Sequence, residues 1–572
     1  MHAYVDLLKL MIKQGKIPNH NPNNNDIQYN TNDGILFSFD NKYTLDVMVL
    51  PSAIVANRCK EFITSNSNSN SNIPIDLLEQ YQLIRIVPLN FEDIQVVYFP
   101  TSLSSSAKAF WQHIGEILSS RKAEAALRSF GFAIPNVTEL YSSKRECLSD
   151  SYSADSSSPN PYQIIKERIM TIVHEPLNDN SITITTSGMA AIYTSLKLIR
   201  RVLGEEYKGC DLEIVVFGFP YLDTLKMMQR TELNPGGYHF FGNGSESDID
   251  ALEQLLIDRD STNSSSSSNG NSNKKIGGVF TEFPTNPLLK APNLKRLHSL
   301  SKRYGFLLVV DDTIGNFANL DLLHHSDVKV DILCTSLTKI FSGRGDVMAG
   351  SLVVNSLGPY YDKLRDALPH LHPEPLYLDD ALVLEINSRD FVERSKRIMK
   401  SAAALALWLC GREEVEYVYY PHPDVINIQK GKERGKERAV TIDPPSVYPS
   451  LLKSNSTHNN NNINNNNNNN NNNDDDDGYG YGCLLSIILK DDYDEKKFFD
   501  ALDFNKGPSL GTNCTLVCPY TLLAHYTELD WAASYGVDRR LVRVSVGLED
   551  IQQILLNFDF ALKASYGFAS SL

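Results

Sequence analysis

The sequence has no apolar run that approaches the roughly 20 residues of a membrane helix, and it has no Cys-x-x-Cys pair. Eight cysteines are spread between Cys59 and Cys518, which is typical of reduced thiols in a cytosolic protein rather than of a disulfide framework. Residues 1–6 lack the basic segment and apolar run of a signal peptide. We therefore expect a cytoplasmic protein without a membrane segment, with the nucleus left open as an alternative location.

Excess positive charge and clustered metal ligands are also missing. The net charge is −15, and four aspartates at 474–477 contribute to it. The basic stretch 430–438 is short and interrupted by glutamates, so we expect no nucleic-acid partner. His324 and His325 have no Cys or His companion at ligand spacing, so we expect no metal site.

The chain of 572 residues is too long for one hydrophobic core, so we expect two or three domains. We predict an N-terminal extension of unknown role at 1–150, a large domain at 151–375 and a C-terminal domain at 376–572. Segments rich in Ser and Asn are expected to be disordered inserts within these domains, at 65–72, about 261–273 and about 454–478.

The large domain alternates short apolar runs with helical patterns, which predicts an α/β fold with a mostly parallel sheet. The predicted strands are 181–186, 213–217, 278–281, 306–310, 330–334 and 351–354. One predicted helix, with leucines at 294, 297 and 300, ends at Gly305. A long helix at 376–409 and strands at 483–489 and 541–546 suggest a smaller α/β domain, and the extension has strands at 84–89 and 94–99 and a helix at 107–130.

Four segments that follow predicted strands or lie in them carry reactive groups. Ser187-Gly188-Met189 opens a helix, whose free backbone N–H groups and dipole favour a phosphate; the alternative is a simple serine N-cap. Asp311 follows the most buried strand and needs a cation there, such as a protonated pyridine nitrogen; the alternative is a capping aspartate.

The other two segments supply an amine and a guanidinium. Lys339, in Ser336-Leu-Thr338-Lys339, is a candidate Schiff-base lysine, and the two hydroxyls suit the same phosphate; the alternative is an exposed loop lysine. Arg543 lies in an otherwise apolar strand and suits a substrate α-carboxylate, unless it faces outward. Taken together, the four segments predict one pyridoxal 5′-phosphate site.

These motifs resemble the cystathionine synthase and lyase family of Cys/Met metabolism, which has PLP-dependent transferase fold type I. The resemblance covers about residue 160 to the C-terminus. It implies a large domain, a smaller C-terminal domain and a cofactor shell formed by Ser187, Gly188, Met189, Tyr221, Asn286, Asp311, Ser336, Thr338 and Lys339. Further matching segments are the Glu-x-Pro-Thr-Asn-Pro motif at 282–287 and the Arg-x-Ser-x-Gly-x-Glu-Asp motif at 543–550.

Segments 336–343 and 108–113 resemble the fungal cystathionine γ-synthase branch in particular, although the role of the second segment is not evident. Two departures stand out. Cys514 replaces an acidic residue near the substrate. The family's cross-subunit Tyr-x-Arg is replaced by Asp155 and Ser157, with Tyr141 and Arg145 as candidate substitutes after an insertion.

The resemblance implies that cystathionine is made from O-succinyl- or O-acetylhomoserine and cysteine. In that reaction Lys339, Tyr221 and Asp311 are catalytic, and Arg543 with Ser509 binds the substrate carboxylate. It also implies a homo-oligomer, a tetramer of paired dimers. The alternatives are an O-acetylhomoserine sulfhydrylase, a cystathionine lyase, or a PLP-binding regulatory protein that has lost catalysis.

Overall fold

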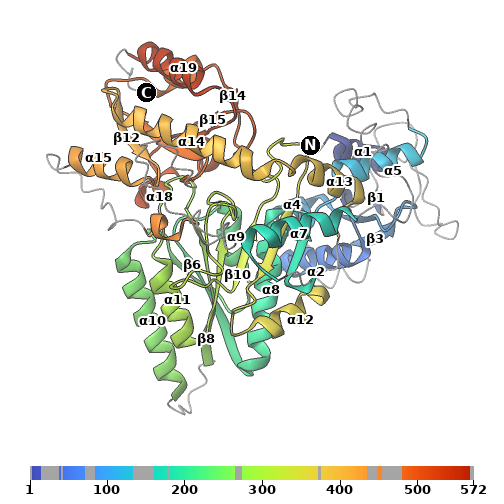
Figure 1. Ribbon diagram of the computed structural model, residues 1–572. Coiled ribbons are helices and arrows are strands. Elements are labelled where there is room, and N and C mark those ends of the chain that lie inside the picture. The colour runs from blue at the N-terminus through green and yellow to red at the C-terminus, as the bar shows by residue number, and fades with distance from the viewer. Residues whose placement is uncertain are drawn as a thin grey trace, which may run out of the picture.

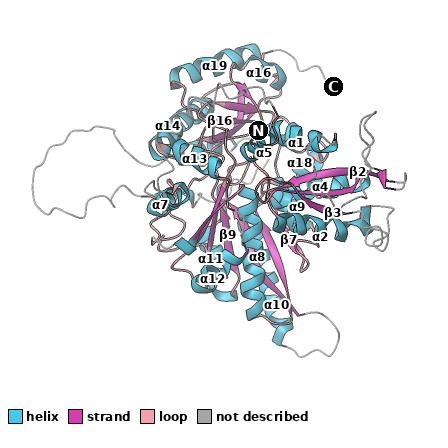
Figure 2. Cartoon of the chain, turned by 90° about the vertical axis from the view of Figure 1, so that its right-hand side faces the viewer, coloured by secondary structure: helices cyan, strands magenta, loops and turns pink. Residues whose placement is uncertain are grey.

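The computed structural model describes residues 3–14, 38–39, 43–70, 84–132, 160–176, 179–264, 273–371, 375–433, 447–453 and 480–566. Within these residues the strands form three sheets, of four, seven and five strands. Figure 1 shows the N-terminal elements at the right, the largest sheet with its helices below, and the C-terminal elements at the top. Turned by 90°, Figure 2 again separates the sheets, with β2 and β3 at one side and β16 at the top.

The N-terminal sheet is antiparallel, in the order β1-β2-β4-β3. Its strands are Ser38–Phe39, Tyr43–Leu50, Gln95–Pro100 and Arg85–Pro88 in that order, and its helices are α1 (Ala3–Lys13), α2 (Ala53–Asn70), α4 (Ser104–Ile114) and α5 (Ser120–Ser129). The single helix predicted at 107–130 is wrong. Gly115 takes a φ of 70°, the left-handed conformation that ends a helix, and so separates α4 from α5.

The largest sheet has the order β5-β11-β10-β9-β8-β6-β7, and β11 runs opposite to the other strands. This confirms the predicted α/β fold with a mostly parallel sheet. Its strands are β5 (Ile182–Thr185), β6 (Cys210–Phe217), β7 (Tyr238–Phe241), β8 (Asn273–Glu282), β9 (Leu307–Asp311), β10 (Ile332–Thr335) and β11 (Gly350–Val354). The helices between and after them are α7 (Pro161–Val173), α8 (Gly188–Glu206), α9 (Leu222–Gln229), α10 (Glu246–Ser264), α11 (Leu294–Tyr304) and α12 (Tyr361–Leu371).

Both faces of this sheet are buried, because successive residues of its central strand enter different cores. Leu308 and Val310 of β9 pack with α7, α10 and α11, whereas Leu307 and Val309 pack with α8, α9 and α12. A strand buried on both faces reads as a continuous apolar run, which is how β9 was predicted. The predicted helix stop is confirmed as well, since Gly305 ends α11 with a φ of 74°.

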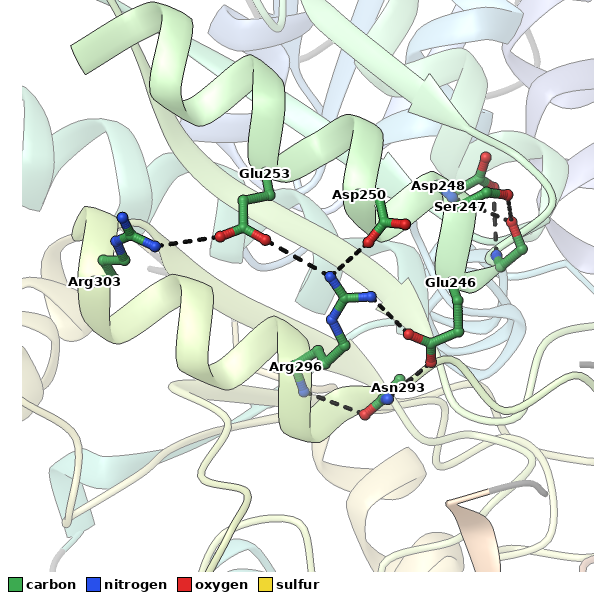
Figure 3. Close-up of polar contacts among 9 residues, drawn as sticks. Glu246, Ser247, Asp248, Asp250, Glu253, Asn293, Arg296 and Arg303 are labelled. Carbon is green, nitrogen blue, oxygen red and sulfur yellow. Dashed lines mark hydrogen bonds and ion pairs between the residues drawn. The ribbon is translucent and has the colours of Figure 1, made fainter. Parts of the chain in front are cut away.

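Helices α10 and α11 lie side by side on one face and are joined by ion pairs (Figure 3). The Arg296 guanidinium lies 2.7 Å from both the Glu246 and Asp250 carboxylates, and Arg303 lies 3.2 Å from Glu253. Asn293 caps α11 and donates to Glu246 over 2.8 Å. These partly exposed contacts set the helix register and add modest stability.

The C-terminal sheet has the order β12-β13-β16-β15-β14. Its strands are β12 (Val415–Tyr419), β13 (Leu484–Leu489), β14 (Asn505–Lys506), β15 (Leu516–Cys518) and β16 (Val542–Ser545), and the helices are α13 (Leu378–Asn387), α14 (Phe391–Cys410), α15 (Pro423–Glu433), α16 (Glu495–Ala501), α17 (Tyr520–Ala524), α18 (Leu529–Ser534) and α19 (Ile551–Ala564). The continuous helix predicted at 376–409 is wrong. The helix is interrupted after Asn387. There the Ser388 hydroxyl donates to the Leu384 carbonyl and accepts a hydrogen bond from Arg168.

The low-complexity segments are partly ordered, contrary to prediction. Helix α2 continues through Ser65 to Asn70, α10 extends to Ser264, and β8 already begins at Asn273. A helix that is nucleated by buried residues gains one backbone bond per added residue, so polar residues can extend it. The predicted insert at 454–478 lies outside the described residues. Among those that are described, no helix combines the length and apolarity needed to cross a membrane.

Candidate active site

A cavity of about 660 Å³ opens where parallel strands of the largest sheet end and the C-terminal sheet begins. Strands β5, β8, β9 and β10 end at this edge, and the loops that follow them line the cavity. All the site residues predicted from the sequence line it: Ser187, Gly188, Met189, Tyr221, Asn286, Asp311, Ser336, Thr338, Lys339, Ser509 and Arg543. Segments separated by more than 300 residues in sequence therefore meet in one site.

Lys339 follows β10 and points its amine toward the C-terminal part of the chain. Its Nζ donates to the Ser509 hydroxyl over 3.0 Å. Burial, with a further contribution from the Arg543 charge, lowers the pKa of Lys339 to about 8, although Asp311 opposes the shift. The amine is therefore neutral in an appreciable fraction of molecules near neutral pH, as a nucleophile or proton acceptor requires.

Two carboxyl groups lie next to each other at the ends of β8 and β9. Glu282 and Asp311 are paired in the sheet register. Burial raises the pKa of both, and their mutual repulsion adds to the shift at Glu282. Asp311 accepts a 2.9 Å bond from the Thr313 N–H, and Glu282 accepts one from the Tyr221 N–H. A cationic ligand atom at Asp311 would lower the free energy of this acidic pair.

The segment before α8 suits a phosphate group. Ser187 caps the helix by accepting from the Ala190 N–H over 3.1 Å, so the capping role considered from sequence is present. The Gly188 and Met189 N–H groups belong to the same first turn, where backbone donors have no partner within the helix. A Cβ on Gly188 would lie 2.9 Å from the Ser336 Cβ, so only glycine allows these two loops to approach.

Arg543 of β16 points into the cavity and is only 3% exposed, which excludes the outward orientation left open by the sequence. Its two Nη atoms donate to Asn286 Oδ1 and to the Ser509 carbonyl, both over 3.1 Å. Its guanidinium carbon lies 4.6 Å from the centre of the Tyr520 ring. Within the described residues these partners are neutral, so the positive charge suits a ligand carboxylate.

Sequence reasoning missed several residues that line the cavity. Tyr520 lies under Arg543 and accepts a 3.3 Å bond from the Asn286 amide. Gln112 reaches the cavity from α4, although it is distant in sequence from the other lining residues. The only signal for Gln112 was its place in the segment 108–113, and Tyr520 had none because a tyrosine after a strand is an ordinary core residue.

The two departures from the family motifs have different outcomes. Cys514 contacts the Thr512 hydroxyl at 3.7 Å and is not among the residues that line the cavity. Tyr141, Arg145, Asp155 and Ser157 lie outside the described residues.

The comparisons with known proteins point to one family. A family model described as "Cys/Met metabolism PLP-dependent enzyme" matches residues 249–439, and one described as "Fungal trans-sulfuration enzyme, N-terminal domain" matches 33–119. A cystathionine gamma-synthase-like enzyme of Amanita muscaria is 31% identical, covering 92% of this chain and 88% of that protein. The cystathionine gamma-synthase of Neurospora crassa is also 31% identical, with coverages of 92% and 87%. The chain belongs to the Cys/Met metabolism family of PLP-dependent enzymes.

Membership in this PLP-dependent family establishes pyridoxal 5′-phosphate as the cofactor, and amino acids are the substrates typical of the family. The fold also matches a crystal structure of cystathionine gamma synthase from Xanthomonas oryzae in complex with aminoacrylate and cysteine. The TM-score is 0.52 at 19% identity, over 73% of this chain and 90% of that one. The residues of the cavity fit the cofactor. The cavity offers a lysine amine, buried acid groups for a pyridinium and a glycine-lined helix start for a phosphate.

Other ligand chemistries receive little support from the described residues. No three His, Cys, Asp or Glu side chains there are grouped closely enough to hold a metal ion. The cysteines in that part of the chain are free thiols. His324, considered above for a metal, lies 3.2 Å from the Glu175 carboxylate.

Asp312→Asn should reduce the pH dependence of stability. Asp312 is fully buried, and burial raises its pKa to about 8, so between about pH 4 and about pH 8 the folded protein keeps a proton that the unfolded chain has lost. Stability therefore falls as pH rises through this window. We expect the native protein to lose about 4 kcal/mol of stability between pH 5 and pH 8 that the variant does not lose.

Chemical unfolding of the cofactor-free protein between pH 5 and pH 8 measures this difference. Asp366→Asn is the control, because Asp366 is exposed on α12. If the free energy of unfolding changed with pH in the same way for the native protein and for Asp312→Asn, the expected protonation of Asp312 would be contradicted.

Proposed function

We propose that the protein is a cystathionine γ-synthase that joins O-succinyl- or O-acetylhomoserine to L-cysteine. The observation that carries the proposal is that Lys339 and Arg543 meet at one residue, Ser509. Its hydroxyl accepts from the Lys339 amine over 3.0 Å, and its carbonyl accepts from the Arg543 guanidinium over 3.1 Å. A proton-transfer group and a carboxylate-binding group are therefore adjacent, as an α-amino acid substrate requires. The named activity of the fungal relatives supports the choice of reaction.

The roles of the side chains follow from their positions. When bound, pyridoxal phosphate would supply an electron sink for the α carbon of the substrate, and Asp311 would pair with its pyridine nitrogen. Arg543 and Ser509 hold the substrate carboxylate, which fixes the α carbon near the Lys339 amine. Lys339 removes and returns protons at the α and β carbons, and a pKa of about 8 suits both directions near neutral pH.

The remaining residues orient the reactants. Asn286 is held by Arg543 and Tyr520, and its side chain faces the same cavity. Tyr221 immediately precedes α9 at the cavity wall with 46% of its surface exposed, where its ring can cover the cofactor. In the net reaction the γ carbon–oxygen bond breaks, a carbon–sulfur bond forms with the cysteine thiolate, and succinate or acetate leaves.

A product assay on the purified protein tests the proposal. Each acylhomoserine is supplied with cysteine or with sulfide, and products are separated and identified. Cystathionine from cysteine is the expected result. Homocysteine formed from sulfide alone would instead indicate a sulfhydrylase, and cleavage of added cystathionine would indicate a lyase. Bound cofactor with no turnover on any of these substrates would favour a regulatory protein.

A further inference from the structure

The N-terminal domain contacts the phosphate end of the cofactor cavity. Helix α4 packs against α8 and α9 of the large domain, as Figure 1 shows. It ends at Gly115, and its residue Gln112 lines the cavity together with Ser187, Gly188 and Met189. The segment 108–113, whose role was not evident from the sequence, therefore contributes Gln112 to the wall of the cavity.

The closest contact is made by the Gly115 carbonyl. It accepts from the Thr186 hydroxyl over 3.0 Å and from the Ser187 hydroxyl over 2.7 Å. A Cβ on Gly115 would lie 2.3 Å from Ser187 Oγ and 2.8 Å from the Ala190 nitrogen, besides requiring a φ of 70°. Only glycine permits this approach of two backbones.

The contact with the Gly115 carbonyl determines which hydrogen bonds the Ser187 hydroxyl can still form. A hydroxyl has one proton to donate, and here the Gly115 carbonyl accepts it while the Ala190 N–H donates to the oxygen. The Ser187 hydroxyl therefore has no proton left for a phosphate, and the donors that remain within this segment are the backbone N–H groups of Gly188 and Met189. The direction of these two N–H groups depends on the orientation of Ser187, which the Gly115 carbonyl fixes.

Two neighbouring residues fasten the same segment to the large domain. Glu116 is 1% exposed, accepts from Arg58 over 2.5 and 2.6 Å, and lies 3.5 Å from the Lys197 amine of α8. His113 accepts a 2.8 Å bond from the Arg230 guanidinium, just after α9. Buried contacts on both sides of Gly115 leave it little freedom to move away from Ser187.

We propose that the N-terminal domain is a positioning element of the cofactor site. Through the Gly115 carbonyl it orients Ser187, and thereby the Gly188 and Met189 N–H groups, and through the Gln112 amide it donates to the cofactor phosphate. The domain thus sets the affinity for pyridoxal phosphate from within the same chain. This role is independent of which acylhomoserine or sulfur nucleophile reacts.

Gly115→Ala tests the first contact, with Gly131→Ala as its control. Both glycines lie in the N-terminal domain with positive φ, 70° and 81°, but a Cβ on Gly131 meets nothing within 4 Å. The dissociation constant of pyridoxal phosphate is measured by titrating the full-length cofactor-free chain and following the visible absorbance. Gly115→Ala should weaken binding by about tenfold or more, whereas Gly131→Ala should change it less than about twofold. Equal effects of the two substitutions would overturn the proposal.

Gln112→Ala gives a second test that does not strain the backbone. Its control is Lys108→Ala, one turn earlier on α4 and exposed. We expect Gln112→Ala to weaken cofactor binding by about threefold or more, with an unchanged melting temperature of the cofactor-free protein. If Gln112→Ala bound pyridoxal phosphate with native affinity, the proposed bond from the Gln112 amide would be wrong. If Gly115→Ala did so as well, the N-terminal domain would have a packing role only.

Discussion

Lys339→Ala is expected to abolish product formation, with kcat reduced about 1,000-fold or more. The substitution removes the amine that bonds to Ser509 and that carries protons between the α and β carbons in the proposed reaction. If Lys339 holds the cofactor through a Schiff base, the visible absorbance of that linkage should be lost as well.

Steady-state assays and absorbance spectra of the purified variant measure both effects. Lys302→Ala is the matched control, since Lys302 is an exposed lysine on α11 away from the cavity. Partial recovery of activity by an added primary amine would support a role of Lys339 in proton transfer. Turnover close to that of the native protein would show that another residue carries the protons.

Arg543→Lys should raise the KM for the acylhomoserine by about 10- to 100-fold with a smaller change in kcat. Lysine keeps the charge but loses the fork that bonds to Asn286 and Ser509 and can hold a carboxylate with two parallel bonds. The carboxylate is bound equally in the ground state and in the transition state, so the loss appears in KM.

Initial rates over a range of acylhomoserine concentrations separate the two parameters. Arg540→Lys is the control, because Arg540 lies three residues earlier and forms ion pairs with Asp538 and Asp491 instead. A fall in kcat at unchanged KM would mean that Arg543 acts in the chemical steps and not in binding.

Local sequence patterns were sufficient to predict those strands and helix ends that depend on residues close together in the chain. The apolar run of β9 and the glycine that ends α11 are properties of short segments, and the structure has both. Sequence reasoning failed where a distant contact decided the outcome. The break after Asn387 depends on Arg168, which lies more than 200 residues earlier and bonds to Ser388. The end of α4 coincides with Gly115, where only glycine leaves room for the approach of Ser187.

For the site, the sequence by itself determined which chemical groups are available and the order in which they occur. An amine at Lys339, an acid at Asp311 and a glycine at 188 are each tied to the end of a strand or the start of a helix. Parallel strands place such ends at one edge of the sheet, so their meeting could be inferred. The tertiary structure alone decided that Arg543 faces inward, that Tyr520 lies under it and that the N-terminal domain reaches Ser187. The pairing of β16 between β13 and β15 and the docking of α4 on α8 are set by packing of surfaces far apart in the chain, for which local residue patterns carry no signal.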